Sequence, residues 1–317
     1  QATGVAVEGI RREISPLLLA ERRKAEASAQ GAAVTQAFLV TVETALGAAE
    51  SPDSLTGRIA AFESALISAA SRPESQSQIT SVLTAAQKIT DHLNTGSSSF
   101  QAGRAAADAA IGAQVTQLND ALSRVAQLNE QIRVADAAGA DSNNLQDLRQ
   151  KTVDAIASII PVKEYAREGG AIALYSTSGA TLVDGRASVF GFESAGAVSA
   201  GQTIGNGALS GLTLNGREIA TDGAGLIAGG ALAANFDIRD RLAPQLQDNL
   251  DAVARNLIER FQDPSVDSTL VPGSAGLFTD AGSAFMAPNE AGLSGRIAIN
   301  AAVDPANDGE LWRIRDG

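Results

Sequence analysis

A stripe of apolar residues runs through the segment from Phe100 to Val134 and is the clearest pattern in the sequence. Its members recur at steps of three or four residues, with mostly polar residues between them: Ile111, Val115, Leu118, Leu122, Val125, Leu128 and Ile132. This spacing is typical of a helix that buries one face in a bundle or coiled coil. Roughly 35 residues at about 1.5 Å each predict a helix about 50 Å long. Such a helix needs partner helices along its length.

Helical spacing also governs most of the chain before and after this segment. The expected helices cover about Ile10 to Gly47, Leu55 to Leu66, Ile79 to Leu93, and about Asn143 to Ile160. The second of them follows Ser51-Pro52-Asp53-Ser54, a typical helix start. The first half of the chain is therefore predicted to be helical throughout.

Proline and glycine leave three helix boundaries open. Ser15-Pro16 either opens the first helix or kinks it. Gly96 to Ser99 is typical of a loop but also fits inside a longer helix. Helical spacing returns from Phe236 to Phe261, and the unbroken helix is expected to begin either at Phe236 or only at Pro244. This return helix is predicted to pack beside the helix of residues 100–134.

The stretch from Val162 to about Leu232 has a different character, because it is rich in glycine and its apolar runs are short and alternating. Two β-hairpins are predicted in it. The first pairs Ala171–Tyr175 with Ala180–Val183, and the second pairs Leu212–Leu214 with Arg217–Ala220. The second hairpin turns at Asn215-Gly216, the strongest short hairpin signal.

These elements predict an α+β fold, a long-helix bundle with an inserted small Gly-rich β domain. Residues 1–161 and 233–317 are expected to form one discontinuous helical domain, and residues 162–232 the insert. Beyond Asp263 the chain shows turn signals and two possible strands, Arg296–Asn300 and Leu311–Ile314.

The composition limits the classes of partner that the chain can bind. Aromatic residues make up only 4%, so the core must be built from Leu, Ile, Val and Ala. With 24 basic and 36 acidic residues the net charge is −12, and an acidic surface repels both nucleic acid and anionic membrane. The absence of cysteine excludes disulfides and thiolate sites. We therefore expect no nucleic-acid and no membrane partner.

The ends of the chain suggest an internal fragment cut at both sides. The sequence begins at Gln1, its single methionine is Met286, and nothing at the start resembles a cleavable signal peptide. No apolar run reaches the roughly 18 residues that indicate a membrane span.

The search for catalytic chemistry starts from His92, the only histidine. It ends a helical stripe, and we interpret it as a polar residue at a helix end that interacts with terminal carbonyls. Gly205 to Gly211 has neither the spacing of a dinucleotide fingerprint nor the Lys-Ser/Thr of a P-loop, so a turn is expected. We predict no catalytic, no cofactor-binding and no metal-binding residues.

Two groups of charged residues are interpreted as surface residues without a binding role. Asp304, Asp308 and Glu310 lie close together in sequence without the spacing of an EF-hand, and are expected in a solvated loop. Arg22-Arg23, like Arg11-Arg12, is balanced by nearby Glu and is predicted to lie on a helix surface.

Four motifs in order resemble the flagellar hook-associated protein 1 family, FlgK. Two of them are Arg11-Arg12-Glu13 and Phe62–Leu66 with Arg72–Ser75. The third is a Leu-Asn-x-Gln-Ile helix end followed by an Asn-x-Leu-x-Asp-x-Arg helix start, and the fourth a Gly-Gly-x-Leu segment leading to Arg-Asp. The residues of the last two motifs are Leu128, Asn129, Gln131, Ile132, Asn143, Leu145, Asp147, Arg149, Gly229, Gly230, Leu232, Arg239 and Asp240. Asn235 stands where the family usually has an aliphatic residue.

The resemblance covers most of residues 1–262 and implies a flagellin-like helical core, without the terminal segments by which the family polymerises. It implies a structural adaptor ring at the junction of hook and filament, outside the cell, exported through the flagellar secretion apparatus without signal cleavage. The implied partners are the hook protein, neighbouring copies, the second hook–filament junction protein and, through the missing C-terminus, an export chaperone.

Two other functions stay open at this point. One is another flagellar axial protein, either flagellin or the other junction protein, because these share an inserted domain between two bundle halves. The other is a secreted hydrolase on a helical scaffold. It would need a carboxylate pair or a histidine site in a cleft.

Overall fold

The computed structural model describes residues 15–48, 50–222 and 225–316. The chain forms two compact units. Unit 1 consists of Gln1–Thr35, Ala109–Ser194 and Ser210–Asp237, and unit 2 of Gln36–Asp108, Ala195–Leu209 and Ile238–Gly317. Residues 1–14, which include the Arg11-Arg12-Glu13 motif and the expected start of the first helix, lie outside the described residues.

Long helices dominate the first half of the chain, as predicted. They are α1 (Pro16–Leu46), α2 (Leu55–Ser71), α3 (Gln76–Ala137) and α4 (Asn143–Ile159). The return segment comprises α5 (Ala231–Asp237), a π-helical turn (Ile238–Leu242) and α6 (Ala243–Phe261), and the short α7 (Arg313–Asp316) follows near the end. The strands are β1 (Val162–Ala166), β2 (Ile172–Ser176), β3 (Thr181–Asp184), β4 (Arg186–Ala187), β5 (Phe190–Gly191), β6 (Leu212–Leu214), β7 (Arg217–Ile219), β8 (Phe278–Asp280) and β9 (Ile297–Ile299).

The open helix boundaries are now decided. Pro16 is the first residue of α1. A backbone N–H at this position would have no partner within the helix, so proline, which lacks it, loses no hydrogen bond there. Pro244 is the second residue of α6, so the unbroken α-helix begins at Ala243, directly after the π-helical turn. The expected start before α2 is confirmed, because the Ser54 hydroxyl accepts a hydrogen bond from the Gly57 N–H at 3.2 Å.

Gly96 to Ser99 does not form a loop, since α3 runs through it without a break. In unit 2 a Cβ at Gly96 would stand 2.8 Å from a methyl carbon of Leu46 and 2.9 Å from one of Leu250. The glycine therefore allows close packing of neighbouring helices, and Ser97 donates to the side chain of Gln247 at 3.0 Å. Small residues that suggested a turn serve helix packing instead.

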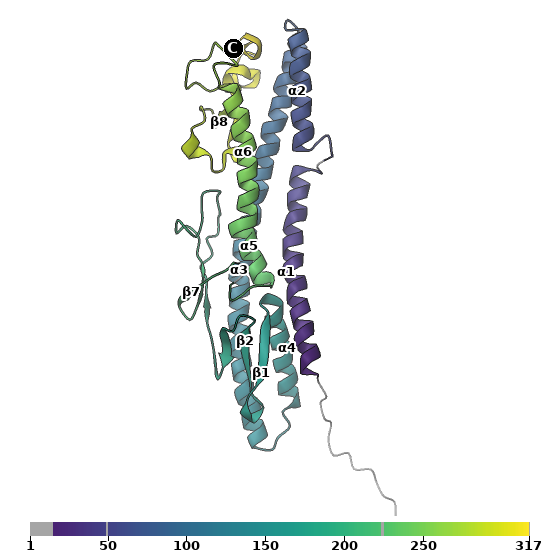
Figure 1. The fold of residues 1–317 in the computed structure, drawn as a ribbon, viewed down its shortest axis with the longest axis vertical. Helices are drawn as coiled ribbons and strands as arrows, with labels where there is room; N and C mark the ends of the chain where they lie inside the picture. Colours follow the sequence, from purple (N-terminus) through teal and green to yellow (C-terminus); the bar gives the residue numbers. More distant parts are fainter. Residues whose placement is uncertain (1–14, 49, 223–224, 317) are drawn as a thin grey trace, which may run out of the picture. The chain divides into compact units, whose positions relative to one another are not determined.

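Unit 1 has a core in which helix and sheet residues share one cluster. The seam of α3 from Ile111 to Val125 packs there with Val153 and Ile156 of α4, with Leu174 and Val183 of the sheet, and with Phe236 of α5. Figure 1 shows β1 and β2 beside α4. A four-stranded antiparallel sheet has the order β1-β2-β3-β4, and a second sheet the order β5-β6-β7.

Both predicted hairpins of unit 1 are confirmed. β2 pairs antiparallel with β3, and β6 pairs antiparallel with β7. The turn between β6 and β7 places Asn215 at φ 51° and Gly216 at φ 76°. Positive φ at both central residues is what the tight hairpin turn requires, and Asn-Gly tolerates it.

Unit 2 packs α2, α6 and residues 76–108 of α3 alongside one another (Figure 1). Three phenylalanine rings, those of Phe62, Phe261 and Phe278, meet at centroid distances of 5.3–5.8 Å. β8 pairs antiparallel with β9, so the predicted strand at 296–300 is confirmed. The strand predicted at 311–314 is wrong, because turn residues and α7 occupy this segment. Four residues are too few for alternation to distinguish strand from helix.

The expectation that the return helix packs beside residues 100–134 is confirmed only in part. Gln247 of α6 bonds to Ser97 and Gln101 of α3, all within unit 2. The α3 seam from Ile111 to Val125 is instead covered by α4, α5 and the sheets of unit 1. The boundaries of the two compact units differ from the predicted boundaries of the insert at residues 162 and 232. The inserted β domain therefore stays a prediction.

Candidate structural sites at the motif residues

The motif residues Asn129 and Arg149 meet in unit 1 at the start of strand β2. Asn129 donates from its amide to the carbonyl of Ile172 at 2.8 Å and accepts from the Ile172 N–H at 3.1 Å. Its side chain thus makes the two hydrogen bonds to the Ile172 backbone that a neighbouring strand would otherwise make. Arg149 donates to the side-chain oxygen of Asn129 and to the carbonyl of Gly170, each at 2.8 Å. This buried group joins α3, α4 and the sheet.

A second asparagine of α3 repeats this arrangement at another strand. Asn119 donates to the carbonyl of Phe190 at 2.8 Å and accepts from the Phe190 N–H at 2.8 Å. Both asparagines give a strand residue the two hydrogen bonds that its backbone requires when buried. Sequence reasoning missed Asn119, although it adjoins the apolar stripe at Leu118.

The other members of the third motif have different environments. Leu128 and Ile132 are fully buried in the α3 seam, as the apolar stripe predicts. Gln131, Asn143 and Asp147 are exposed, and Leu145 is half-buried.

Gly229 and Gly230 allow a close approach of backbones in unit 1. Gly229 has φ +88°, a conformation that side-chain-bearing residues rarely adopt. A Cβ on Gly230 would stand 2.4 Å from the carbonyl oxygen of Ile159, the last residue of α4. Leu232, two residues on, is fully buried in the core. The buried Asn235 donates to the carbonyl of Ala231 at 3.1 Å and to Gln114 at 3.2 Å, so its polar side chain is accommodated by hydrogen bonds.

The fourth motif ends in a buried charge network of unit 2. Arg239 donates to Asp108 at 2.8 Å and forks onto both oxygens of Asp240 at 2.8 and 2.9 Å. The side chains of Arg239 and Asp108 are both 0% exposed. Asp108 also accepts from the N–H of Ala195 at 2.8 Å. The π-helical turn before Pro244 carries this arginine.

Arg104 continues the network. It donates to the carbonyls of Arg239 at 2.8 Å, Ser199 at 2.8 Å and Gln202 at 2.6 Å. Burial lowers the pKa of the Arg104 guanidinium from its ordinary value, and nearby Arg239 adds to the lowering. A buried arginine with three carbonyl acceptors fixes loop 195–209 onto α3.

Sequence reasoning missed Arg104 and Asp108, although a signal was present. Phe100, Arg104, Asp108 and Ile111 follow one another at steps of four, four and three, so both charges stand on the buried stripe. Charged residues at stripe positions indicate a buried ion pair, because an unpaired charge there would be costly.

Arg23 corrects another interpretation. The prediction that Arg22-Arg23 lies on a helix surface is wrong for Arg23, whose side chain is buried. It donates to Asp154 at 2.7 Å and to Glu164 at 2.7 Å, and so joins α1 to α4 and β1 within unit 1. The acceptors come from segments more than 130 residues away, so local charge balance could not reveal them.

His92 lies inside α3 and not at its end. Its ring nitrogen Nε2 is 3.1 Å from the carbonyl oxygen of Leu46, the last residue of α1. The predicted contact with a terminal carbonyl is therefore present, but the carbonyl belongs to another helix. Burial lowers the pKa of His92, and the charge of Arg58 adds to the effect.

Acidification is expected to destabilise unit 2 through His92. Because its folded pKa lies below its unfolded value of about 6.5, the unfolded chain binds the proton more readily. The stabilisation is fully present above about pH 6.5 and is lost as the pH falls below that value. Thermal melting between pH 7.5 and 5 should show a steeper loss for wild type than for His92→Gln. Equal slopes would contradict the shift.

The remaining sequence-predicted groups form turns. Gly207 has φ +75° in a turn held by hydrogen bonds between Thr203 and Asn206. The Asp304 carboxylate is largely buried and caps the N–H of Ala306 at 3.0 Å, so for this residue the expected solvated loop is wrong. In the part of the chain that the structure describes, no His, Cys, Asp or Glu cluster could hold a metal ion. None of the described helices is long and apolar enough to cross a membrane.

Comparisons with known proteins agree with the family resemblance. The family model described as the flagellar hook-associated protein FlgK helical domain matches residues 39–271. The flagellar hook-associated protein 1 of Salmonella typhimurium is 27% identical over 184 residues, which are 57% of this chain and 33% of that protein. The Escherichia coli (strain K12) protein of the same name is 26% identical over 184 residues, with the same coverage. The chain thus spans about a third of the length of these relatives.

The fold is shared with a solved structure. The flagellar hook junction protein FlgK from Burkholderia pseudomallei matches with a TM-score of 0.64 and 19% sequence identity. The match covers 82% of this chain and 46% of that chain.

Proposed function

Because this chain belongs to the family of the flagellar hook-associated protein FlgK helical domain, we propose that it is a structural component of the bacterial flagellum at the junction of hook and filament. The observation that carries the proposal is the family match over residues 39–271. The shared fold with a flagellar hook junction protein supports it. The role is mechanical and involves no catalysis.

The buried polar groups fit a mechanical role. In unit 1, Arg23 and Asn129 join helices to strands, and in unit 2, Arg104 and Arg239 join a helix to a loop and a π-helical turn. Buried hydrogen-bonded charges have fixed geometry, because moving one partner leaves the other unsatisfied at a cost of several kcal/mol. Each unit is therefore suited to transmit force without rearranging.

The proposed partners and location follow from the family. The chain would contact the hook protein on one side, the second hook–filament junction protein on the other, and neighbouring copies of itself. An export chaperone would bind a C-terminal segment of the full-length protein. The protein would act outside the cell, after export by the flagellar secretion apparatus without signal cleavage.

Removing the full-length gene tests the proposal. We expect bare hooks in electron micrographs and flagellin shed into the medium, both reversed by the wild-type gene on a plasmid. Normal filaments in the deletion strain would overturn the proposal. Absent filaments with no flagellin in the medium would instead favour flagellin itself, the alternative within the same class.

A further inference from the structure

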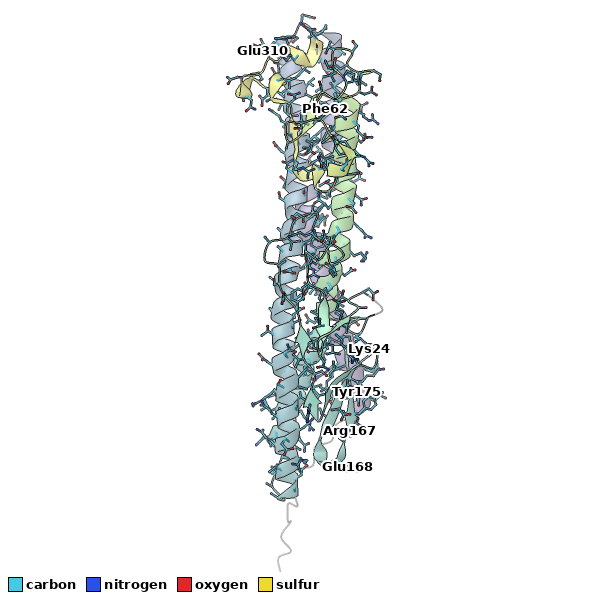
Figure 2. All side chains as sticks on the ribbon, turned by 90° about the vertical axis from the view of Figure 1, so that its left-hand side faces the viewer. Lys24, Phe62, Arg167, Glu168, Tyr175 and Glu310 are labelled. Carbon is cyan, nitrogen blue, oxygen red and sulfur yellow. The ribbon has the colours of Figure 1, made fainter. Side chains whose placement is uncertain are left out.

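The four-stranded sheet of unit 1 has an exposed face with aromatic and basic side chains. Lys163, Tyr165, Arg167, Tyr175, Ser176 and Gly179 line a shallow hollow of about 350 Å³ there, which we call the tyrosine face. Both tyrosines of the chain belong to it, although only 4% of all residues are aromatic. Their rings meet edge to face at a centroid distance of 5.6 Å. Figure 2 shows Tyr175 and Arg167 close together on this side of the unit.

The tyrosine face is not needed for the core. The opposite side of the same sheet is the buried one and carries Ile172, Leu174 and Val183. Tyr165, in contrast, is 51% exposed. Exposed tyrosine and arginine side chains that gather in one hollow are typical of the centres of protein interfaces.

Hydrogen bonds hold the tyrosine face in one arrangement. Arg167 donates to the Tyr175 hydroxyl at 2.9 Å and to Asp184 at 2.9 and 3.2 Å, and the Tyr175 hydroxyl donates to Asp184 at 2.8 Å. The Arg167 guanidinium and the Tyr175 hydroxyl lower the pKa of Asp184. Side chains ordered before binding lose less conformational entropy when a partner arrives.

The charges of the tyrosine face indicate which kind of partner would fit it. The chain carries a net charge of −12, yet the residues that line the tyrosine face include two cations, Lys163 and Arg167, and no carboxylate. Asp184, outside this lining, pairs with Arg167. Figure 2 shows Lys24 and Glu168, both exposed, on the same side of the unit. A hollow lined by cations and tyrosines favours an acidic partner with apolar side chains, and a second copy of this chain, with its net charge of −12, is acidic overall.

Unit 2 carries a segment of that chemistry. Residues 262–295 contain no Lys or Arg. Within them the segment from Asp263 to Val271, here called the acidic loop, exposes Val266 (66%) and Val271 (68%) beside two carboxylates. No cation pairs with Asp263 or Asp267 among the residues that the structure describes. A backbone hydrogen bond from Ser265 lowers the pKa of Asp263.

We propose that the tyrosine face of one copy binds the acidic loop of a neighbouring copy. The carboxylates of Asp263 and Asp267 would meet Lys163 and Arg167, while the two valines would cover the tyrosine rings. The two surfaces differ, so the contact is head-to-tail and can repeat from copy to copy around an axis. This inference rests on the proposed function, because it describes how copies join in the assembled flagellum.

Cysteine cross-linking tests the contact, since the chain has no cysteine of its own. Thr181 is exposed opposite Tyr175 in the sheet, and Ser268 is exposed in the acidic loop. The full-length protein with Thr181→Cys and Ser268→Cys should give an oxidant-dependent ladder of dimers and higher multimers in isolated flagella. Each single variant, and Thr116→Cys with Ser268→Cys, should give none. A cross-link within one chain, or to another flagellar protein, would overturn the proposal.

Charge reversal provides a second readout. Lys163→Glu or Asp267→Lys alone should reduce the cross-linked fraction roughly fivefold, the change expected from one exposed ion pair, and the two reversals together should restore it. Lys163 is exposed, and Asp267 is half-buried in a loop where its carboxylate accepts two hydrogen bonds from Thr269, so only a small change in melting temperature is expected. No restoration, or no ladder while filaments assemble normally, would refute the contact but leave the junction role intact. Failure of the deletion test would refute the junction role itself.

Discussion

Replacing Arg239 with methionine is expected to destabilise unit 2 by about 3–5 kcal/mol. The variant removes the cation that neutralises Asp108, and both side chains are 0% exposed. A carboxylate left in a dry environment without its cation costs far more than the lost hydrogen bonds alone. Urea denaturation of the wild-type protein and of Arg239→Met would measure the loss as a lower transition midpoint in the variant.

Two comparisons separate the buried charge from the general effect of losing an arginine. Arg133→Met removes an exposed pair with Glu130 on α3 and should leave the midpoint nearly unchanged. Arg239→Met combined with Asp108→Leu removes both buried charges and should recover most of the loss, because apolar pairs often replace buried ion pairs without cost. A double variant no more stable than Arg239→Met would show that the ion pair is not the cause.

Replacing Leu122 with aspartate is expected to destabilise unit 1 by at least about 4 kcal/mol, which is a large part of the roughly 5–15 kcal/mol that stabilises an ordinary domain. Leu122 is 0% exposed at the centre of the α3 seam. The variant loses a well-packed side chain and places a carboxylate among apolar residues. Leu250→Asp, at a 5% exposed position of α6, should have a similar effect on unit 2.

Neighbouring exposed positions provide matched controls. Gln117→Asp on α3 and Asn249→Asp on α6 introduce the same charge into the same helices on their solvent side. Thermal melts followed by circular dichroism should show little change for these two variants and a large loss for the two leucine variants. A Leu122→Asp protein that melts like Gln117→Asp would contradict the assignment of the seam.

Helix and hairpin positions followed from local patterns. The stripe from Ile111 to Ile132 predicted a buried helix face, and all seven of its residues are buried. Asn215-Gly216 predicted the second hairpin because the turn needs positive φ at both positions. Local patterns failed where small residues have two uses: Gly96 could end a helix or let two helices approach.

The sequence by itself determined the helical periodicity, the hairpins and the family, because spacing and short motifs are local properties of the chain. Only the tertiary structure decided what the charged motif residues do. Arg23 meets Glu164 and Arg239 meets Asp108 across more than 130 residues of sequence, and Asn129 finds its strand 43 residues away. Whether a charged side chain lies at the surface or in the core depends on which distant segment the fold brings against it. The spacing of residues along the sequence does not contain this information.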